Sequence, residues 1–322
     1  MYFKSKRSNR LKIKAVDFFC GAGGVTKGLL DAGIDVICGI DNDSKAKKTY
    51  ENNNIRPNGK KVEFIDCDIN KLSFSDLRKR LQNEKYDKLL FVGCAPCQPF
   101  TNINTLKEKR KREKNHLIRF ADFIEYFNPD YLFVENVPGI TAKKYGGILG
   151  RFKNILKKLN YYYLDNNINA KNYGIPQNRN RRILIASLGK PISFPEETHG
   201  KRKKSYVTIL EVLRKYKLKP LKAGEKDSND PLHRAANLNK TNLWRIKNTP
   251  KNGGGRNIWM ESKPVECYLR QKNSYTDVYN RMYWNKPSPT ITTRFNSLSN
   301  GRFGHPEEDR AISLREGALF QT

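Results

Sequence analysis

The stretch Lys14–Gly24, KAVDFFCGAGG, decides the fold of this chain. Its apolar part, Lys14–Phe19, predicts a strand, and Thr26–Leu30 predicts the start of a helix directly after the glycines. Glycines at a strand-to-helix turn let a ligand approach the backbone, and the helix amino terminus offers free N–H groups. Thr26 stands where a dinucleotide-binding fingerprint requires Gly or Ala, which argues against a dehydrogenase.

Two further predicted strands end in acidic residues. Val36–Ile40 is an apolar strand that Asp41 ends, about 20 residues past the glycines, where ribose hydroxyls are usually bound. The next strand, Val62–Ile65, ends in Asp66-Cys67-Asp68. Acids at successive strand ends fit a nucleoside ligand, because its ribose and its adenine both donate hydrogen bonds. Each acid alone is also compatible with a solvated turn or a helix cap, so the interpretation depends on the series.

A cysteine follows another predicted strand. Leu89–Val92 is an apolar run, and Pro96-Cys97-Gln98 lies just beyond it, where open α/β sheets place their ligand crevice. Pro96 and Pro99 restrict the backbone, so the Cys97 thiol would be held in place. A small buried apolar residue is the alternative for Cys97. Its CxxC spacing with Cys94 does not indicate zinc, because no second CxxC or HxxxH supplies the other ligands.

Two more motifs lie near predicted strands. Tyr131–Val134 predicts an apolar strand that delivers Glu135 in the sequence Glu-Asn-Val-Pro-Gly. Ile183–Ala186 predicts another strand, preceded by Arg179 and Arg181 in the sequence Gln-Asn-Arg-Asn-Arg. A surface acid and salt-bridged arginines at a strand start are the alternatives, which these segments alone leave open.

Composition indicates a polyanionic partner. Among 322 residues, 62 Lys and Arg against 32 Asp and Glu give a formal net charge of +30, which favours sequence-independent phosphate binding. Six cysteines at irregular spacing predict reduced thiols and a cytoplasmic protein. No apolar stretch approaches about 18 residues and the first residues are basic and polar, so neither a membrane span nor a signal peptide is predicted.

Length and composition predict a larger and a smaller domain. Residues 11–187 are expected to form a doubly wound α/β domain with a mostly parallel sheet. Residues 188–285 change character, with scattered Pro and Gly, the basic cluster Lys201–Lys204 and the glycine-rich segment Gly253–Arg256. They are expected to form the smaller, irregular domain.

In their order and spacing, these motifs resemble those of the DNA cytosine-5 methyltransferases over almost the whole chain. The resemblance implies an S-adenosylmethionine-dependent methyltransferase fold, a target-recognition domain at 188–285, and a late segment, 286–322, that returns toward the catalytic domain. It also implies a monomer that acts on double-stranded DNA and uses S-adenosylmethionine without a metal. The segments that carry the resemblance are Asp17–Gly28, Gly93–Phe100, Glu135–Val137, Gln177–Arg181, Ser288–Thr292 and Ser313–Glu316.

By this resemblance four side chains carry the chemistry. Cytosine C5 is a poor nucleophile, and attack of the Cys97 thiolate on C6 makes C5 enamine-like, so that it accepts a methyl group. Glu135 supplies a proton or a strong hydrogen bond to N3, and Arg179 and Arg181 hold O2 and nearby phosphates. Because C6 is hidden within the base stack of a duplex, the target cytosine has to be flipped out.

The resemblance also implies contacts to the cofactor and to DNA. The residues expected to contact S-adenosylmethionine are Asp17, Phe18, Cys20, Gly21, Gly23, Gly24, Asp41, Asn42, Asp68, Ile69 and Pro96. The residues expected to contact DNA are Gln98, Lys109, Arg110, Arg112, Gln177, Arg256 and Arg294. The basic loop after Cys97 is expected to close over phosphates beside the flipped base, with a solvated charge run as its alternative.

The carboxyl end departs from the family pattern. Family members continue past Leu319–Gln321 to a last motif, a turn and a helix that complete the cofactor pocket, whereas this sequence ends at Thr322. Weak S-adenosylmethionine binding by the chain alone is therefore expected. A truncated reading frame, a shortened version of the protein, and a split enzyme completed by a separate polypeptide stay open.

Two other functions are kept as alternatives. One is a cytosine-5 methyltransferase that acts on tRNA, and the other is a catalytically impaired DNA-binding remnant. The long segment after Gly189 favours DNA over tRNA, because it has the character of a bacterial recognition domain. The intact set of Cys97, Glu135, Arg179 and Arg181 favours an active enzyme over a remnant. A bacterial or phage restriction–modification setting is expected.

Overall fold

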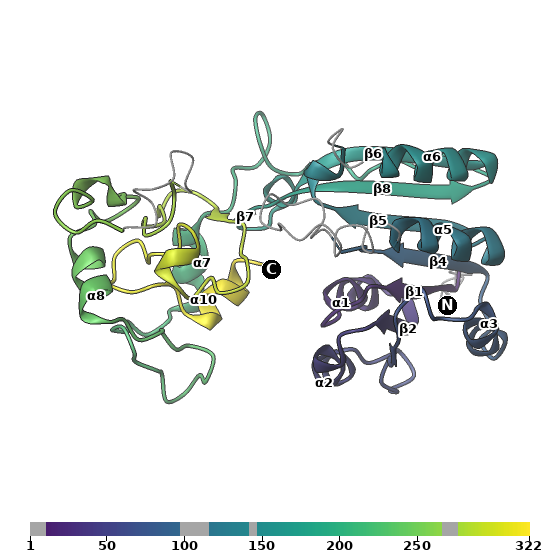
Figure 1. The fold of residues 1–322 in the computed structure, drawn as a ribbon, viewed down its shortest axis with the longest axis horizontal. Helices are drawn as coiled ribbons and strands as arrows, with labels where there is room; N and C mark the ends of the chain where they lie inside the picture. Colours follow the sequence, from purple (N-terminus) through teal and green to yellow (C-terminus); the bar gives the residue numbers. More distant parts are fainter. Residues whose placement is uncertain (1–10, 97–115, 142–146, 266–275) are drawn as a thin grey trace, which may run out of the picture. The chain divides into compact units, whose positions relative to one another are not determined.

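The computed structural model describes residues 11–96, 116–141, 147–265 and 276–322 of the chain (Figure 1). The chain divides into two compact units. Unit 1 comprises Met1–Asn167 and Arg181–Pro195, and unit 2 comprises Ile168–Asn180 and Glu196–Thr322. Each unit has its own core and is described by itself.

Unit 1 is built on a seven-stranded sheet with the strand order β3-β2-β1-β4-β5-β8-β6 (Figure 1). Neighbouring strands are parallel from β3 to β5, whereas β8 pairs antiparallel with β5. The strands are β1 (Ile13–Phe18), β2 (Asp35–Asp41), β3 (Glu63–Asp66), β4 (Lys88–Gly93), β5 (Tyr131–Asn136), β6 (Tyr161–Asn169) and β8 (Asn180–Leu188). The predicted doubly wound, mostly parallel sheet is confirmed.

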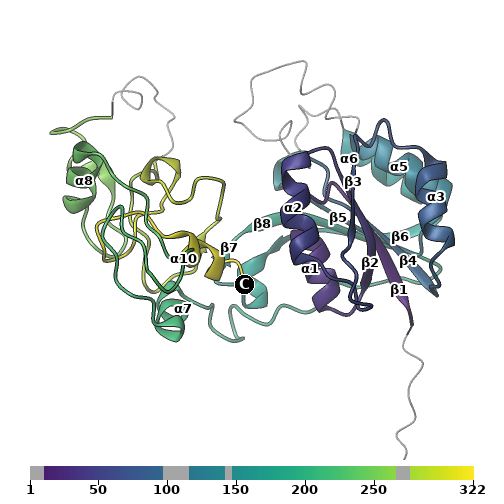
Figure 2. The ribbon, with the colours of Figure 1, turned by 90° about the horizontal axis from the view of Figure 1, so that it is seen from below.

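Helices cover both faces of this sheet. Figure 2 shows α1 (Gly24–Asp31) and α2 (Ser44–Asn53) on one face. The other face carries α3 (Phe74–Gln82), α5 (His116–Phe127) and α6 (Ile148–Lys158), and the short helix η2 (Pro138–Thr141) follows β5. Among the described residues, no helix has the length and apolar character needed to cross a membrane.

Strand β4 shows why the sequence predicts this sheet. Leu89 and Phe91 pack into the core on the α5 and α6 face, whereas Leu90 and Val92 pack into the core on the α1 and α2 face. A strand buried on both faces has a continuous apolar sequence, which makes it recognisable. Gly93 ends the strand against Phe120, where an added Cβ would lie 2.5 Å from the ring.

Over its described residues, unit 2 contains little regular structure. Its helices are α7 (Ile209–Tyr216), α8 (Lys240–Lys247), α10 (Leu314–Leu319), η4 (Ala170–Tyr173), η5 (Arg256–Ile258) and η6 (Leu298–Asn300). Two short strands, β7 (Gln177–Asn178) and β9 (Ser288–Pro289), pair in parallel. Apolar side chains from distant parts of the sequence form its cores, among them Trp259, Met282, Phe303 and Phe320.

The observed units differ from the predicted domain boundaries. Residues 168–180 and 286–322 belong to unit 2. The pairing of β7 with β9 joins these segments, and Gln177 Nε2 donates a hydrogen bond to Phe320 O at 3.1 Å. Residues 286–322 therefore help to build the core of unit 2, where Phe320 packs with Met282. The role of unit 2 in target recognition stays a prediction.

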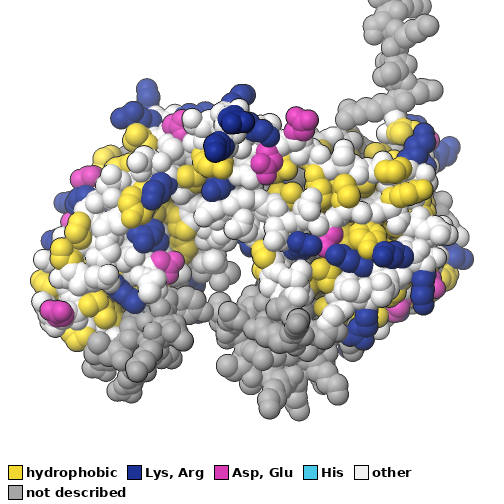
Figure 3. Space-filling model, turned by 90° about the horizontal axis from the view of Figure 1, so that it is seen from above, with side chains coloured by type: hydrophobic (Ala, Val, Ile, Leu, Met, Phe, Trp, Pro, Cys, Tyr) yellow, Lys and Arg dark blue, Asp and Glu magenta, His cyan; other side chains and the backbone are white. Residues whose placement is uncertain are grey.

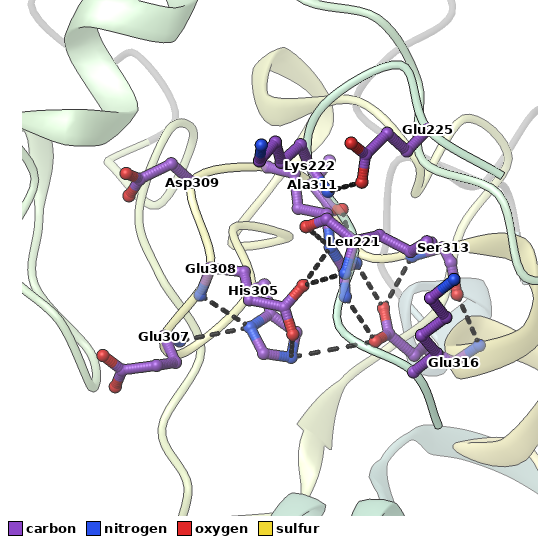
Figure 4. Close-up of polar contacts among 12 residues, drawn as sticks. Leu221, Lys222, Glu225, His305, Glu307, Glu308, Asp309, Ala311, Ser313 and Glu316 are labelled. Carbon is purple, nitrogen blue, oxygen red and sulfur yellow. Dashed lines mark hydrogen bonds and ion pairs between the residues drawn. The ribbon is translucent and has the colours of Figure 1, made fainter. Parts of the chain in front are cut away.

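In part of unit 2, buried charged side chains supply hydrogen bonds that regular secondary structure would otherwise supply (Figure 4). Arg310 is fully buried and donates to both carboxylate oxygens of Glu316 at 2.8 Å. Arg281 is also fully buried, and it donates to the carbonyl oxygens of Ile246, Thr249, His305 and Glu308. The guanidinium groups satisfy carbonyls that a sheet would otherwise satisfy.

Burial and charge set the protonation of this cluster. Burial alone would raise the pKa of Glu316, but hydrogen bonds and charge from Arg310 lower it to about 2. Burial lowers the pKa of His305 to about 4, and its Nδ1 accepts the backbone N–H groups of Glu307 and Glu308. Glu316 is therefore ionised and His305 neutral near pH 7. Ser313 and Glu316 also form the capping box that starts α10.

Candidate cofactor and catalytic site

A cavity of about 300 Å³ lies at the carboxyl ends of β1, β2 and β3 in unit 1. It brings together six of the residues predicted to contact the cofactor: Phe18, Asp41, Asn42, Asp68, Ile69 and Pro96. Four further lining residues were not predicted: Phe19, Ile40, Cys67 and His116. His116 begins α5, far along the chain from the strand ends, and its ring lies 5.7 Å from that of Phe19. No periodicity or motif in the sequence indicates this approach.

The glycine-rich turn adjoins the cavity through Asp41, which lines it and is bonded to Gly21. Gly21 and Gly23 have φ angles of 50° and 90°, a conformation that favours glycine. Asp41 Oδ2 accepts the backbone N–H of Gly21 at 2.8 Å, and its Oδ1 accepts the N–H of Asp43 at 2.9 Å. An added Cβ on Gly21 would meet nothing within 4 Å, so a ligand has room beside the turn. The Asp41 carboxylate is thereby fixed at the cavity wall.

Asp17 and Cys20 lie beneath the turn and do not line the cavity. Asp17 is fully buried, and its Oδ2 accepts the Thr26 hydroxyl at 2.7 Å. Thr26 in turn lies 2.9 Å from the Tyr50 hydroxyl oxygen. Cys20 is 8% exposed, and an added Cβ on Gly39 would lie 2.7 Å from its sulfur. Asp17 is enclosed with Thr26, and Cys20 lies in the same apolar cluster as Tyr50, so both support the turn, and their contact with the cofactor stays a prediction.

Burial also sets the protonation of the groups beneath the turn. It raises the pKa of Asp17 to about 7, although the hydrogen bond from Thr26 partly opposes this shift. Burial likewise raises the pKa of the Cys20 thiol. At mildly acidic pH the Asp17 carboxyl and the Cys20 thiol beneath the turn are therefore both neutral.

An ion pair marks the end of β5. Arg181 Nε lies 2.7 Å from Glu135 Oε1, and the two side chains are 21% and 25% exposed. Glu135 is opposite Ile183 in the antiparallel pairing of β5 with β8, so Arg181 reaches it diagonally. The tertiary structure thus brings together two residues that the sequence predicted to be catalytic.

The next residue ties this strand end to the segment before Cys97. Asn136 is buried, its Nδ2 donates to Ala95 O at 3.1 Å, and its Oδ1 accepts the Val137 N–H at 2.9 Å. Asn136 was not predicted as a site residue, although it lies within the Glu-Asn-Val motif. The contact places Pro96 beside the end of β5.

Other predicted site residues belong to unit 2 or lie outside the described residues. Arg179 belongs to unit 2, where it lies between β7 and β8 and its N–H donates to Asn169 Oδ1 at 3.1 Å. Five predicted residues lie outside the described residues: Cys97, Gln98, Lys109, Arg110 and Arg112. Their roles stay predictions.

Two residues predicted to contact DNA, Gln177 and Arg256, are buried within unit 2. Gln177 is 1% exposed, its Nε2 donates to Phe320 O, and its Oε1 accepts the Ile291 N–H. Arg256 is 6% exposed. Both side chains are enclosed by unit 2, and their contact with DNA stays a prediction. Arg294 is exposed and has a φ of 64°, and it is accessible to a ligand.

Sheet order and the glycine-rich turn together define the class of α/β methyltransferases. Residues 13–322 match the family of C-5 cytosine-specific DNA methylases. The chain therefore belongs to this family, as the motifs predicted, and it is a DNA cytosine methyltransferase. Members of the family depend on S-adenosylmethionine. Among the residues that the structure describes, no cluster of His, Cys, Asp and Glu could hold a metal ion.

Relatives and solved structures agree with this assignment. The Type II methylase M.HgiDII of Herpetosiphon aurantiacus is 37% identical over 95% of this chain and 83% of its own length. The Type II methyltransferase M1.BsuMI of Bacillus subtilis is 30% identical over 96% and 72%. An E. coli prophage protein described as a DNA modification methyltransferase shares the fold with a TM-score of 0.67, 20% identity, and coverage of 96% and 88%.

Proposed function

We propose that the chain transfers a methyl group from S-adenosylmethionine to C5 of a flipped-out cytosine in a specific duplex DNA sequence, through a covalent bond between Cys97 and C6. The observation that carries the proposal is the ion pair of Glu135 with Arg181. It lies beside the segment that leads to Cys97, and Pro96 of that segment also lines the cavity. A carboxyl group, a guanidinium and a cavity thus adjoin the described segment that precedes the predicted nucleophile.

The cavity fits the adenosine part of S-adenosylmethionine. Asp41 and Asp68 offer acceptors for ribose hydroxyls and the adenine amine, and Phe18 and Ile69 offer apolar contacts. The turn at Gly21 leaves space for a ligand against the backbone. When bound, the cofactor supplies an electrophilic methyl group on a sulfonium.

The side chains of the chain account for the remaining steps. The Cys97 thiolate forms a bond to C6, and Glu135 meets the charge that develops at N3 by donating a proton or a strong hydrogen bond. Arg181 orients Glu135 and can contact O2 of the base. After methyl transfer a base removes the C5 proton, the bond from sulfur to C6 breaks, and 5-methylcytosine is released.

Charge supports DNA as the substrate. Lys and Arg side chains are spread over the face that Figure 3 shows. The net charge of +30 provides the sequence-independent attraction to phosphates. Arg294, Gln98 and the basic residues Lys109, Arg110 and Arg112 are proposed to contact the DNA. The similarity to the Type II enzymes M.HgiDII and M1.BsuMI supports a restriction–modification role.

Methyl transfer to mixed-sequence duplex DNA and, separately, to tRNA tests the proposal, with analysis of the product nucleosides. We expect 5-methylcytosine in DNA, and none with Cys97→Ala. Product in tRNA alone would favour the tRNA enzyme. DNA binding without product would favour the impaired remnant or a split enzyme, and recovery of activity on adding a second polypeptide would identify the latter.

A further inference from the structure

We propose that Arg119 is a positioning residue for the cofactor cavity, because it holds the loop that carries Asp68 and Ile69. The inference rests on the proposed function, in which this cavity binds S-adenosylmethionine. Arg119 lies in α5 and does not line the cavity itself. No motif in the sequence indicates a role for it.

The guanidinium of Arg119 joins α5 to two backbone carbonyl groups of this loop. Its Nε donates to Ile69 O at 3.2 Å, and one terminal nitrogen donates to Leu72 O at 3.0 Å. The other terminal nitrogen donates to Asp122 Oδ2 at 3.0 Å, one turn further along α5. All three nitrogens are therefore engaged, and the fork geometry of arginine suits two carbonyl acceptors.

Aromatic rings fix the plane of this guanidinium. Its central carbon lies 4.8 Å from the ring centroid of Phe74 and 4.8 Å from that of Phe123. Phe74 opens α3 directly after the loop, and Phe123 follows Arg119 by one turn in α5. A guanidinium held by two rings loses little further freedom when it binds carbonyl groups.

The loop beneath Arg119 shapes the cavity wall. Asp68 O accepts the N–H groups of Lys71 and Leu72, and Asp68 Oδ1 accepts the N–H of Asn70 at 2.9 Å. These bonds close the turn but leave the carbonyls of Ile69 and Leu72 to Arg119. Since Asp68 and Ile69 both line the cavity, a shift of this turn would move two of its contact groups.

The same helix contributes to the cavity directly. His116 lines the cavity one turn before Arg119, so the first turns of α5 form one wall and hold a second wall in place. Loss of Arg119 should therefore weaken cofactor binding without touching the residues that act on cytosine.

The test compares Arg119→Met and Arg119→Lys with the wild-type chain. Binding of S-adenosylhomocysteine is measured by calorimetry, KM and kcat are measured for both substrates, and hydrogen exchange is followed in residues 66–72. We expect Arg119→Met to weaken S-adenosylhomocysteine binding about tenfold and to raise the KM for the cofactor by a similar factor. The kcat at saturating substrate and the KM for DNA should stay within about twofold of the wild-type values. Arg119→Lys has one nitrogen for two carbonyl groups, so its affinity for S-adenosylhomocysteine should lie between those of Arg119→Met and the wild type. Hydrogen exchange in residues 66–72 should be faster in both variants than in the wild type.

Arg80→Met is the matched control. Arg80 also links two elements from a partly exposed position, since it pairs with Glu63 at 2.9 Å and donates to Asp76 O. It does not contact the cavity, so its loss should leave cofactor affinity unchanged. Wild-type affinity in both Arg119 variants, or an equal loss in Arg80→Met, would overturn the inference. A wild-type chain that does not bind S-adenosylhomocysteine would overturn the proposed cofactor site, and the inference with it.

Discussion

Arg181 Nε contacts Glu135 Oε1 at 2.7 Å across the antiparallel junction of β5 and β8. The sheet is parallel up to this junction, so the reversal of β8 brings Arg181 to the carboxyl end of β5. That end adjoins the segment leading to Cys97, through the contact of Asn136 with Ala95. The strand order thus joins two motifs that are 46 positions apart in the sequence.

Glu135→Gln is expected to lower kcat for methyl transfer by about 100-fold or more, because an amide cannot donate a proton to N3. Affinity for duplex DNA should change by less than about twofold, since the pair with Arg181 retains a hydrogen-bond acceptor. Single-turnover methyl transfer and filter binding measure the two effects. Glu125→Gln, at an exposed position of α5, is the matched control. A kcat within about fivefold of wild type in Glu135→Gln would reject the proposed role.

Gly23→Ala is expected to destabilise unit 1 by about 1–3 kcal/mol and to weaken cofactor binding. Gly23 has a φ of 90°, and an added Cβ would lie 2.2 Å from Asn54 Nδ2. Gly28→Ala is the control, because its Cβ would meet nothing within 4 Å on α1. The control should be more stable by about 0.5–1 kcal/mol. Denaturant unfolding measures the stability of both variants. Equal changes in the free energy of unfolding would contradict the strain at Gly23.

Asp17→Asn is expected to stabilise the chain increasingly from about pH 4 to pH 7. Burial raises the pKa of Asp17 from 3.8 to about 7, so the folded state binds this proton more tightly than the unfolded state. Stability is therefore lost as pH rises through this window. The amide keeps the acceptor for Thr26 and carries no charge, so the gain should reach the order of 4 kcal/mol near pH 8.

Urea unfolding at several pH values measures this effect. Asp43→Asn is the control, because Asp43 caps α2 from an exposed position where Asn serves equally well. It should change the free energy of unfolding by less than about 0.5 kcal/mol throughout. A gain from Asp17→Asn that does not vary with pH would rule out a buried, titrating carboxyl.

Glu316→Gln is expected to destabilise unit 2 by about 3 kcal/mol, because it leaves the buried Arg310 without its principal carboxylate. Asp230→Asn is the control, since it weakens the more exposed pair with Arg315 and should cost much less stability. Denaturant unfolding followed by tryptophan fluorescence distinguishes them. Comparable losses would show that the buried pair contributes no more than the exposed one.

The same cluster predicts a loss of stability in acid. Arg310 holds the pKa of Glu316 near 2, so its stabilising effect is present above the ordinary value of 4.5 and is lost as pH falls toward 2. His305, with a pKa lowered to about 4, adds a loss between about pH 6.5 and 4, because the unfolded state binds its proton first. Glu316→Gln should therefore flatten the part of the profile that Glu316 causes, below pH 4.5, whereas the loss that begins near pH 6.5 should remain because His305 is still buried.

The sequence by itself determined the sheet of unit 1 and the place of its cavity. Buried parallel strands are continuous apolar runs, and the turn at Gly21 and Gly23 demands glycine, so both leave local signals. Asp41 and Asp68 end two of these strands, and parallel strands deliver their ends to one edge. The Glu-Asn-Val and Cys97 motifs likewise identified the family, because chemistry restricts residue type at those positions.

The tertiary structure decided which polar residues face a ligand and which serve the interior. Asp17 and Gln177 belong to functional motifs yet are buried, since strand alternation and the pairing of β7 with β9 enclose them. His116 and Arg119 reach the cavity and its loop only because α5 packs against the sheet beside them. Such contacts join segments distant in sequence, and burial depends on packing that no local pattern of residues records.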